Sequence, residues 1–234
     1  MPPPHRLASA PRKRVFALPP PIRSVGFLAR SGRRDVCVDA VLELASLIGH
    51  LPSCIDLLDP ASHLATHCPM DLVLLSRSPS EPVLETQRQA GEAVLRAGPP
   101  VLLLPPTLTQ PRLIGTRALI VWDGSPSAIA ALRAAAPLLR RAKEVMLVDA
   151  ADQEPRASVD SAMAFLRTLP GKRLLDAARL EIDSKPLVLE TAQLARADYL
   201  VMGGLGRWGA LPDVLYGDSD SPFARARLPL LLGQ

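Results

Sequence analysis

The chain has 234 residues, of which 48% are hydrophobic and 3% aromatic, enough Leu, Val and Ala for the core of one large domain or two small ones. No apolar run approaches the roughly 18 residues that span a membrane, and no secretory signal opens the chain. The mildly basic net charge of +4 lacks the interleaved aromatic residues of a nucleic-acid-binding surface. The three cysteines show no CxxC spacing, so we expect a cytoplasmic protein. Because of its charge pattern and the lack of a spanning run, we expect neither a nucleic acid nor a membrane as partner.

Strands and helices are expected to alternate along most of the chain. Residues 1–23 are rich in Pro and Arg and predict an extended lead-in. Apolar runs predict strands and apolar residues at helical spacing predict helices. The expected strands cover residues 24–29, 54–58, 71–76, 101–104, 118–123, 145–148, 179–183, 197–202 and 228–232, and the expected helices cover residues 35–48, 59–67, 81–96, 126–141, 158–169 and 187–196. This alternation predicts an α/β fold with doubly wound parallel sheets.

The strand over residues 118–123 ends in an acid, Asp123, and leads directly into a helix. Gly124 supplies a turn, Ser125 is the expected N-cap and Pro126 suits the first helical position. Pro137 is expected to kink this helix before it ends near residue 141.

A glycine cluster follows the strand over residues 197–202. Gly203, Gly204 and Gly206 would let the backbone approach a ligand closely, at the edge where open α/β sheets bind ligands. Further on, Gly217 precedes an Asp-Ser-Asp-Ser-Pro run that predicts a helix start. Glycine loop and helix N-terminus together predict an anion cradle.

The two halves of the chain repeat one another. Residues 70–75 parallel residues 197–202, residues 98–104 parallel residues 227–232, and residues 24–29 parallel residues 118–123. A duplicated α/β unit explains these parallels. The first copy is shorter by about one strand-plus-helix unit of ~30 residues. It also has Ala29 in place of Asp123 and no glycine cluster after Ser76, which predicts a structural role.

The predicted organisation has four parts. These are a lead-in at 1–23, a degenerate first copy at 24–105, a linker at 106–117 and a complete second copy at 118–234. The closing apolar strands of the copies, residues 101–104 and 228–232, are expected to meet, because that pairing would hide two sheet edges.

The second half resembles the universal stress protein family, specifically its tandem two-copy bacterial type. The matching residues are 121–125 (Val-Trp-Asp-Gly-Ser), 197–206, Tyr216-Gly217 and the closing strand. The match covers residues 118–234 well and 62–104 weakly. The resemblance implies a Rossmann-like, adenine-nucleotide-hydrolase-like fold with a five-stranded parallel sheet. It also implies pairing as dimers or intramolecular pseudo-dimers, and ATP binding in some members.

Nucleotide-binding members carry the pattern Gly-x2-Gly-x9-Gly-Ser/Thr, an acid that ends the first strand and a small apolar residue that ends the second. Carried over, the candidate nucleotide-binding residues are Asp123, Val148, Gly203, Gly206, Gly217 and Ser219. The chain departs from the pattern at Tyr216, which stands at the third glycine position, and at Gly217, which replaces the hydroxyl residue. Asp218 and Asp220 add negative charge where a phosphate would lie.

The resemblance implies a non-enzymatic stress-response or regulatory protein that binds ATP or another adenine nucleotide, with no metal other than accompanying Mg²⁺. The alternative is a structural interaction module that binds no nucleotide and acts through its pseudo-dimer surface, with a homodimer as a further option. All histidines lie at or before His67, so the second copy has no Ser-His hydrolase pair. His63 and His67, spaced i, i+4 beside Cys68, lack a second ligand pair, so we do not expect a metal site.

Overall fold

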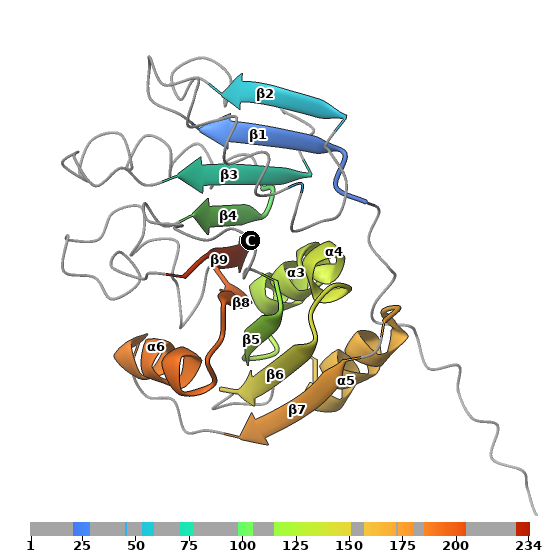
Figure 1. The fold of residues 1–234 in the computed structure, drawn as a ribbon, viewed down its shortest axis with the longest axis vertical. Coiled ribbons are helices and arrows are strands. Elements are labelled where there is room, and N and C mark those ends of the chain that lie inside the picture. The colour runs from blue at the N-terminus through green and yellow to red at the C-terminus, as the bar shows by residue number, and fades with distance from the viewer. Residues whose placement is uncertain are drawn as a thin grey trace, which may run out of the picture.

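One continuous, nine-stranded sheet organises the computed structural model (Figure 1). The structure describes residues 21–28, 45, 53–58, 71–76, 98–104, 115–150, 157–171, 173–179, 185–204 and 228–234. The strands are β1 (Ser24–Leu28), β2 (Cys54–Leu58), β3 (Leu72–Ser76), β4 (Val101–Leu104), β5 (Arg117–Trp122), β6 (Glu144–Asp149), β7 (Leu174–Arg179), β8 (Tyr199–Gly203) and β9 (Leu230–Gly233). Their order in the sheet is β2-β1-β3-β4-β9-β8-β5-β6-β7.

Helices cover both faces of the second half of the sheet, as the alternating pattern predicts. They are α3 (Pro126–Ala134), α4 (Ala136–Leu139), α5 (Val159–Thr168) and α6 (Lys185–Leu194). In Figure 1, α3, α4 and α5 lie on one side of β5 and β6, and α6 lies on the other. None of the described helices combines the length and the apolar character needed to cross a bilayer.

The closing strands of the two halves meet in the middle of the sheet, which confirms that prediction. β4 pairs with β9 in antiparallel register, with Val101 opposite Leu232 and Leu103 opposite Leu230. The other strand pairs are parallel. The strands of the first half therefore run opposite to those of the second half. The two parallel sheets of the sequence prediction form one mixed sheet.

Outwards from the β4–β9 junction, the halves follow the same strand order. The first half runs β4-β3-β1-β2 and the second runs β9-β8-β5-β6-β7. β7 has no counterpart among the described strands of the first half. This order is what a duplication with a shortened first copy requires, and the duplication and its boundaries remain a prediction.

The core forms on both faces of the sheet because the strands are apolar on both sides. Along β5, Ala118, Ile120 and Trp122 face the cluster beneath α3–α5, whereas Leu119 and Val121 face the cluster beneath α6. Such continuous apolar strands are typical of a parallel sheet covered on both faces.

The sequence misplaced one strand. A strand was expected over residues 179–183, but β7 ends at Arg179 and begins at Leu174. β7 pairs with β6 alone at the edge of the sheet, and Leu174 is 67% exposed. An edge strand does not need the apolar run that identifies buried strands. The Leu and Ala residues that form β7 are also strong helix formers.

The start of α3 confirms the predicted local signals. The Ser125 side chain accepts a hydrogen bond from the Ala128 N–H at 3.1 Å, and Pro126 occupies the first turn. The helix is interrupted at Ala135, two residues before Pro137, where a kink was predicted. The helices expected over residues 35–48, 59–67 and 81–96 lie outside the described residues, except for Ala45, which is helical.

Candidate functional site

The carboxyl ends of β5, β6 and β8 lie side by side, because β5 sits between the other two strands. Val121 is opposite Val148, and Ile120 is opposite Val201. This register brings Asp123, which follows β5, level with the ends of β6 and β8. Three of the predicted site residues, Asp123, Val148 and Gly203, therefore belong to the same edge of the sheet, which we call the carboxyl edge.

Asp123 is held in place by the start of α3. Its carboxylate oxygen Oδ1 accepts a hydrogen bond from the Ser125 N–H at 2.9 Å, and Gly124 between them adopts a positive φ of 69°. This local turn is typical of Asp before a helix. The side chain remains half-buried.

Gly203 is required by the packing of α3. A Cβ at Gly203 would lie 2.5 Å from the Ser127 Oγ and 3.1 Å from the Ala128 nitrogen. A Cβ at Gly233 would collide with the backbone of Ser127 and Ala131. The first turns of α3 thus rest directly on the backbone of β8 and β9. Among the described residues, helix α3 leaves no room for a side chain at Gly203. The sequence had suggested that a ligand would require this glycine.

Val148, expected on the adenine side of the site, lies in the core. Its side chain is 0% exposed and belongs to the cluster beneath α6. A ligand would therefore meet the backbone at this position. The next residue, Asp149, is half-buried and ends β6, so its side chain is closer to the surface of the carboxyl edge.

Trp122, the last residue of β5, connects the ends of β5 and β6 with the start of α5. Its indole Nε1 donates a hydrogen bond to the Ala157 carbonyl oxygen at 3.1 Å, and the ring is fully buried. Its own carbonyl oxygen accepts from the Ala150 N–H at 2.8 Å. The ends of β5 and β6 and the start of α5 are therefore held together just behind Asp123.

Acidic residues stand at the carboxyl edge together with a basic one. Asp123 follows β5, Asp149 ends β6 and Asp160 lies in the first turn of α5, whereas Arg179, opposite Asp149, ends β7. Acids at this edge repel phosphate groups unless a cation accompanies the phosphate. Among the described side chains, however, no group of three or more His, Cys, Asp or Glu is arranged to hold a metal ion.

The other predicted site residues, Gly206, Gly217 and Ser219, lie outside the described residues, as do Tyr216 and Asp218. The structure therefore brings together the strand-end part of the candidate site. The expected glycine loop and helix start stay predictions.

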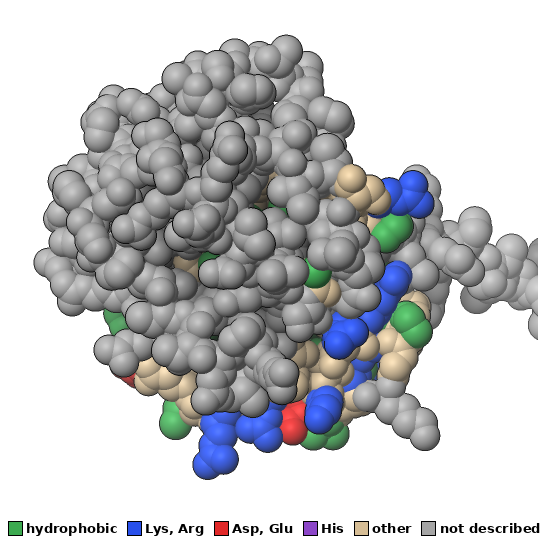
Figure 2. Space-filling view, turned by 45° about the horizontal axis from the view of Figure 1, so that its top comes forward, with side chains coloured by type: hydrophobic (Ala, Val, Ile, Leu, Met, Phe, Trp, Pro, Cys, Tyr) green, Lys and Arg blue, Asp and Glu red, His purple; other side chains and the backbone are tan. Residues whose placement is uncertain are grey.

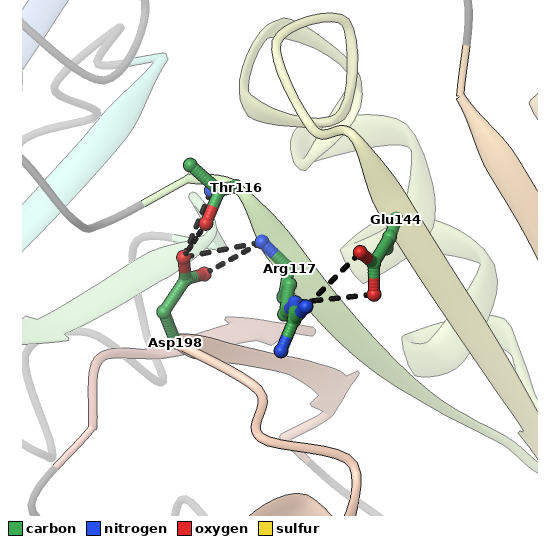
Figure 3. Close-up of polar contacts among 4 residues, drawn as sticks. All are labelled: Thr116, Arg117, Glu144 and Asp198. Atoms are coloured by element: carbon green, nitrogen blue, oxygen red, sulfur yellow. Dashed lines mark hydrogen bonds and ion pairs between the residues drawn. The ribbon is translucent and has the colours of Figure 1, made fainter.

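At the opposite edge of the sheet, Asp198 clamps the start of β5 (Figure 3). Its carboxylate accepts hydrogen bonds from the Thr116 N–H at 2.9 Å, the Thr116 hydroxyl at 2.6 Å and the Arg117 N–H at 3.1 Å. Beside it, Arg117 forms an ion pair with Glu144 of β6, at 3.1 Å between Nε and Oε2. The Asp of the 197–206 motif is thus a structural residue far from the candidate ligand edge.

Asp71 makes the equivalent clamp in the first half. Its Oδ2 accepts from the Arg23 N–H at 2.7 Å, the Ser24 N–H at 2.8 Å and the Ser24 hydroxyl at 3.0 Å. Burial raises the pKa of Asp71, but these hydrogen bonds and the Arg23 charge outweigh this effect, so the pKa lies below the ordinary value of an aspartate. The parallel between residues 70–75 and 197–202 was the signal for this shared role.

Comparison with known proteins identifies the fold. The sequence matches no family model and no curated protein. The structure is similar to a universal stress protein from Archaeoglobus fulgidus, at 14% identity and a TM-score of 0.50, over 90% of this chain and 86% of that chain. It also aligns with the functionally unknown PA1789 from Pseudomonas aeruginosa, at 14% identity and a TM-score of 0.47, over 90% of this chain and 92% of that chain. A universal stress protein in complex with cAMP aligns at 17% identity and a TM-score of 0.35, over 51% of this chain and 97% of that chain. At these identities the likeness concerns the fold, and the chain has a fold similar to that of the universal stress proteins.

Proposed function

We propose that the protein is a non-enzymatic stress-response or regulatory protein that binds an adenine nucleotide at the carboxyl edge of its second half. The observation that carries the proposal is Asp123, fixed by the Ser125 N–H at the end of β5, the middle strand of the second half. Open α/β sheets bind ligands at the carboxyl ends of their strands, and a carboxylate there suits ribose hydroxyls. The similar fold supports the same location.

Charge decides which part of the nucleotide the described residues would hold. The acid Asp123 at the end of β5 suits the hydroxyl groups of a nucleoside and disfavours a bare phosphate beside it. The triphosphate would extend towards the glycine loop with Mg²⁺ bound to it. We therefore expect adenosine to contribute much of the affinity, and Mg²⁺ to strengthen the binding of ATP.

A second function, a structural interaction module without a ligand, is favoured by the packing of Gly203. Because α3 already requires this glycine, its presence is explained without a nucleotide. The departures at Tyr216 and Asp218 favour the same alternative.

Isothermal titration of the full chain with ATP, with and without Mg²⁺, and with adenosine, tests the proposal. We expect saturable heat for Mg²⁺-ATP and weaker binding when Mg²⁺ is removed. Titrations without heat up to millimolar nucleotide would leave the structural module as the function.

Asp123→Asn is the informative variant, because an asparagine oxygen can still accept from the Ser125 N–H and keep the turn. We expect it to weaken ATP and adenosine binding about tenfold, the scale of one charged hydrogen bond. Asp160→Asn, an exposed acid at the same edge, is the matched control and should bind normally. Equal loss in both variants would mean that Asp123 has no specific contact with the ligand.

A further inference from the structure

The second half of the molecule gathers basic residues at one edge of its sheet, which we call the amino edge. The amino edge is the side on which β5–β8 begin and α4–α6 end. It is held together by backbone hydrogen bonds, from the Lys143 N–H to the Thr116 oxygen and from the Leu174 N–H to the Lys143 oxygen, both at 2.8 Å. The described amino edge is mainly basic.

The basic side chains there come from successive elements that lie side by side. Arg140 and Arg141 follow α4, Lys143 precedes β6, Arg167 lies in the last turn of α5 and Arg196 follows α6. All of these are exposed. A Cβ at Gly171 would lie 3.0 Å from the Arg140 oxygen, so the end of α5 is adjacent to the end of α4.

Other basic residues at this edge have structural partners. Arg117 pairs with Glu144. Arg173 donates hydrogen bonds to the carbonyl oxygens of Leu166 in α5 and of Leu169 and Pro170 after α5. The acids Glu144 and Asp198 at this edge also have partners. Glu144 accepts a hydrogen bond from the Arg117 side chain, and Asp198 accepts one from the Arg117 N–H at the start of β5. Within the described part of the chain, the exposed basic residues named above are therefore not neutralised by these acids.

Exposed leucines stand among these charges. Leu174, the first residue of β7, is 67% exposed, and Leu194, the last residue of α6, is 86% exposed. They are the only large hydrophobic residues so exposed in the described part of the chain. On the face shown in Figure 2, Lys and Arg side chains (blue) gather with hydrophobic (green) and acidic (red) side chains among them.

Arg196 adds a sign of strain at this edge. It follows α6 with a positive φ of 50°, and the Ala197 N–H bonds to the Ala192 oxygen at 2.8 Å to close the helix. Glycine is the usual residue in this position, and an arginine there costs about 1 kcal/mol. The exposed side chain of Arg196 thereby stands at the end of α6, with the other basic residues of the amino edge.

We propose that the amino edge of the second half is a docking surface for an anionic membrane. Arginine matches the geometry of lipid phosphates, and each basic residue near an anionic surface adds to the attraction. Leu174 and Leu194 would enter the headgroup layer, a contribution that a nucleic acid cannot use. The sequence argued against a membrane partner only through the absence of a spanning segment, which a peripheral surface does not need.

Vesicle flotation with the full chain tests this proposal. The vesicles contain phosphatidylcholine, either alone or with about one-third phosphatidylglycerol, and the salt is about 0.1 M or 0.5 M. We expect binding to the anionic vesicles alone, weakened at high salt. Arg140→Gln/Arg141→Gln should weaken it about tenfold or more, and Leu174→Ser/Leu194→Ser should weaken it several-fold.

The matched control is Arg23→Gln, compared with the single variant Arg140→Gln. It removes the same charge from an exposed arginine that precedes β1, away from the amino edge of the second half. It should bind almost like the parent protein. If the arginine variant and the leucine variant of the amino edge both still bound anionic vesicles like the parent protein, the proposal would be overturned, because the binding would come from another basic segment. Lack of vesicle binding, or loss of binding in the control equal to that in the edge variants, would also overturn it.

Two further measurements distinguish membrane docking from a purely structural role of these arginines and from nucleic-acid binding. Arg196→Gly should raise the urea midpoint of unfolding and also weaken vesicle binding, an opposition that a purely structural arginine would not produce. If a fluorescent DNA or RNA duplex competes with the vesicles for the protein, we expect the same competition in the parent protein and in Arg140→Gln/Arg141→Gln. Binding of the duplex through these arginines, unaffected by the leucine substitutions, would assign the surface to nucleic acid instead.

Discussion

The carboxylate of Asp198 holds Thr116 by two hydrogen bonds, from the backbone N–H at 2.9 Å and from the hydroxyl at 2.6 Å. Asp198 precedes β8 and Thr116 precedes β5, so the contact fixes the register of two neighbouring strands at their start. In the first half, Asp71 and Ser24 form the same contact at the start of β3 and β1. A residue inside a motif that resembles a ligand-binding family thus serves strand alignment.

We expect Asp198→Ala to lower the free energy of unfolding by about 2–3 kcal/mol, because several buried or half-buried donors lose a charged acceptor. Thr116→Val removes the hydroxyl contact alone and should cost about 1 kcal/mol. Urea denaturation followed by circular dichroism measures both. Nucleotide affinity should be unchanged in folded Thr116→Val, since the clamp lies at the edge opposite the candidate site.

The clamp in the first half predicts a pH dependence. The folded pKa of Asp71 is lowered below the ordinary value of an aspartate, so its contribution to stability is present above the unfolded pKa and disappears as the pH falls through the folded value. Asp71→Asn should therefore reduce stability at neutral pH and lose less stability on acidification below about pH 4. Denaturation midpoints of the parent protein and the variant, compared from pH 7 to pH 3, check this. An equal fall of both denaturation midpoints between pH 7 and pH 3 would contradict this role of Asp71.

Close packing of α3 on β8 predicts a rescue experiment. Gly203→Ala would place a Cβ 2.5 Å from the Ser127 Oγ and should destabilise the fold by about 1–3 kcal/mol. Ser127→Ala removes that oxygen, so the double variant should regain part of the loss in a double-mutant cycle. Gly233→Ala meets the backbone of α3 instead, and Ser127→Ala should not rescue it. Additive effects of Gly203→Ala and Ser127→Ala would contradict the contact.

Tyr199 offers a stabilising substitution. Its phenol oxygen is buried and has no hydrogen-bond partner within the described part of the chain, and burial raises its pKa. Tyr199→Phe removes an unsatisfied polar atom and should raise the free energy of unfolding by about 1 kcal/mol. Trp122→Phe is the contrasting variant, because its indole N–H bonds to the Ala157 oxygen, and it should destabilise. Loss of stability in Tyr199→Phe would indicate that the hydroxyl has a partner such as buried water.

Much of the architecture followed from the sequence, because it depends on local patterns. Apolar runs located the buried strands β5, β6 and β8, since a parallel strand covered on both faces must be apolar throughout. Ser125 and Pro126 marked the start of α3, because capping depends on residues adjacent along the chain. The meeting of β4 and β9 followed from the need of two apolar strands to avoid exposed sheet edges.

The tertiary structure decided which neighbours these elements meet. Gly203 pointed to a ligand in the sequence, but the helix that crosses it, α3, is placed by packing between elements that are distant along the chain. The burial of Val148 and the edge position of β7 depend in the same way on what covers each strand. The basic edge with Leu174 and Leu194 exists only because strand starts and helix ends converge in space, although their residues are scattered along the sequence.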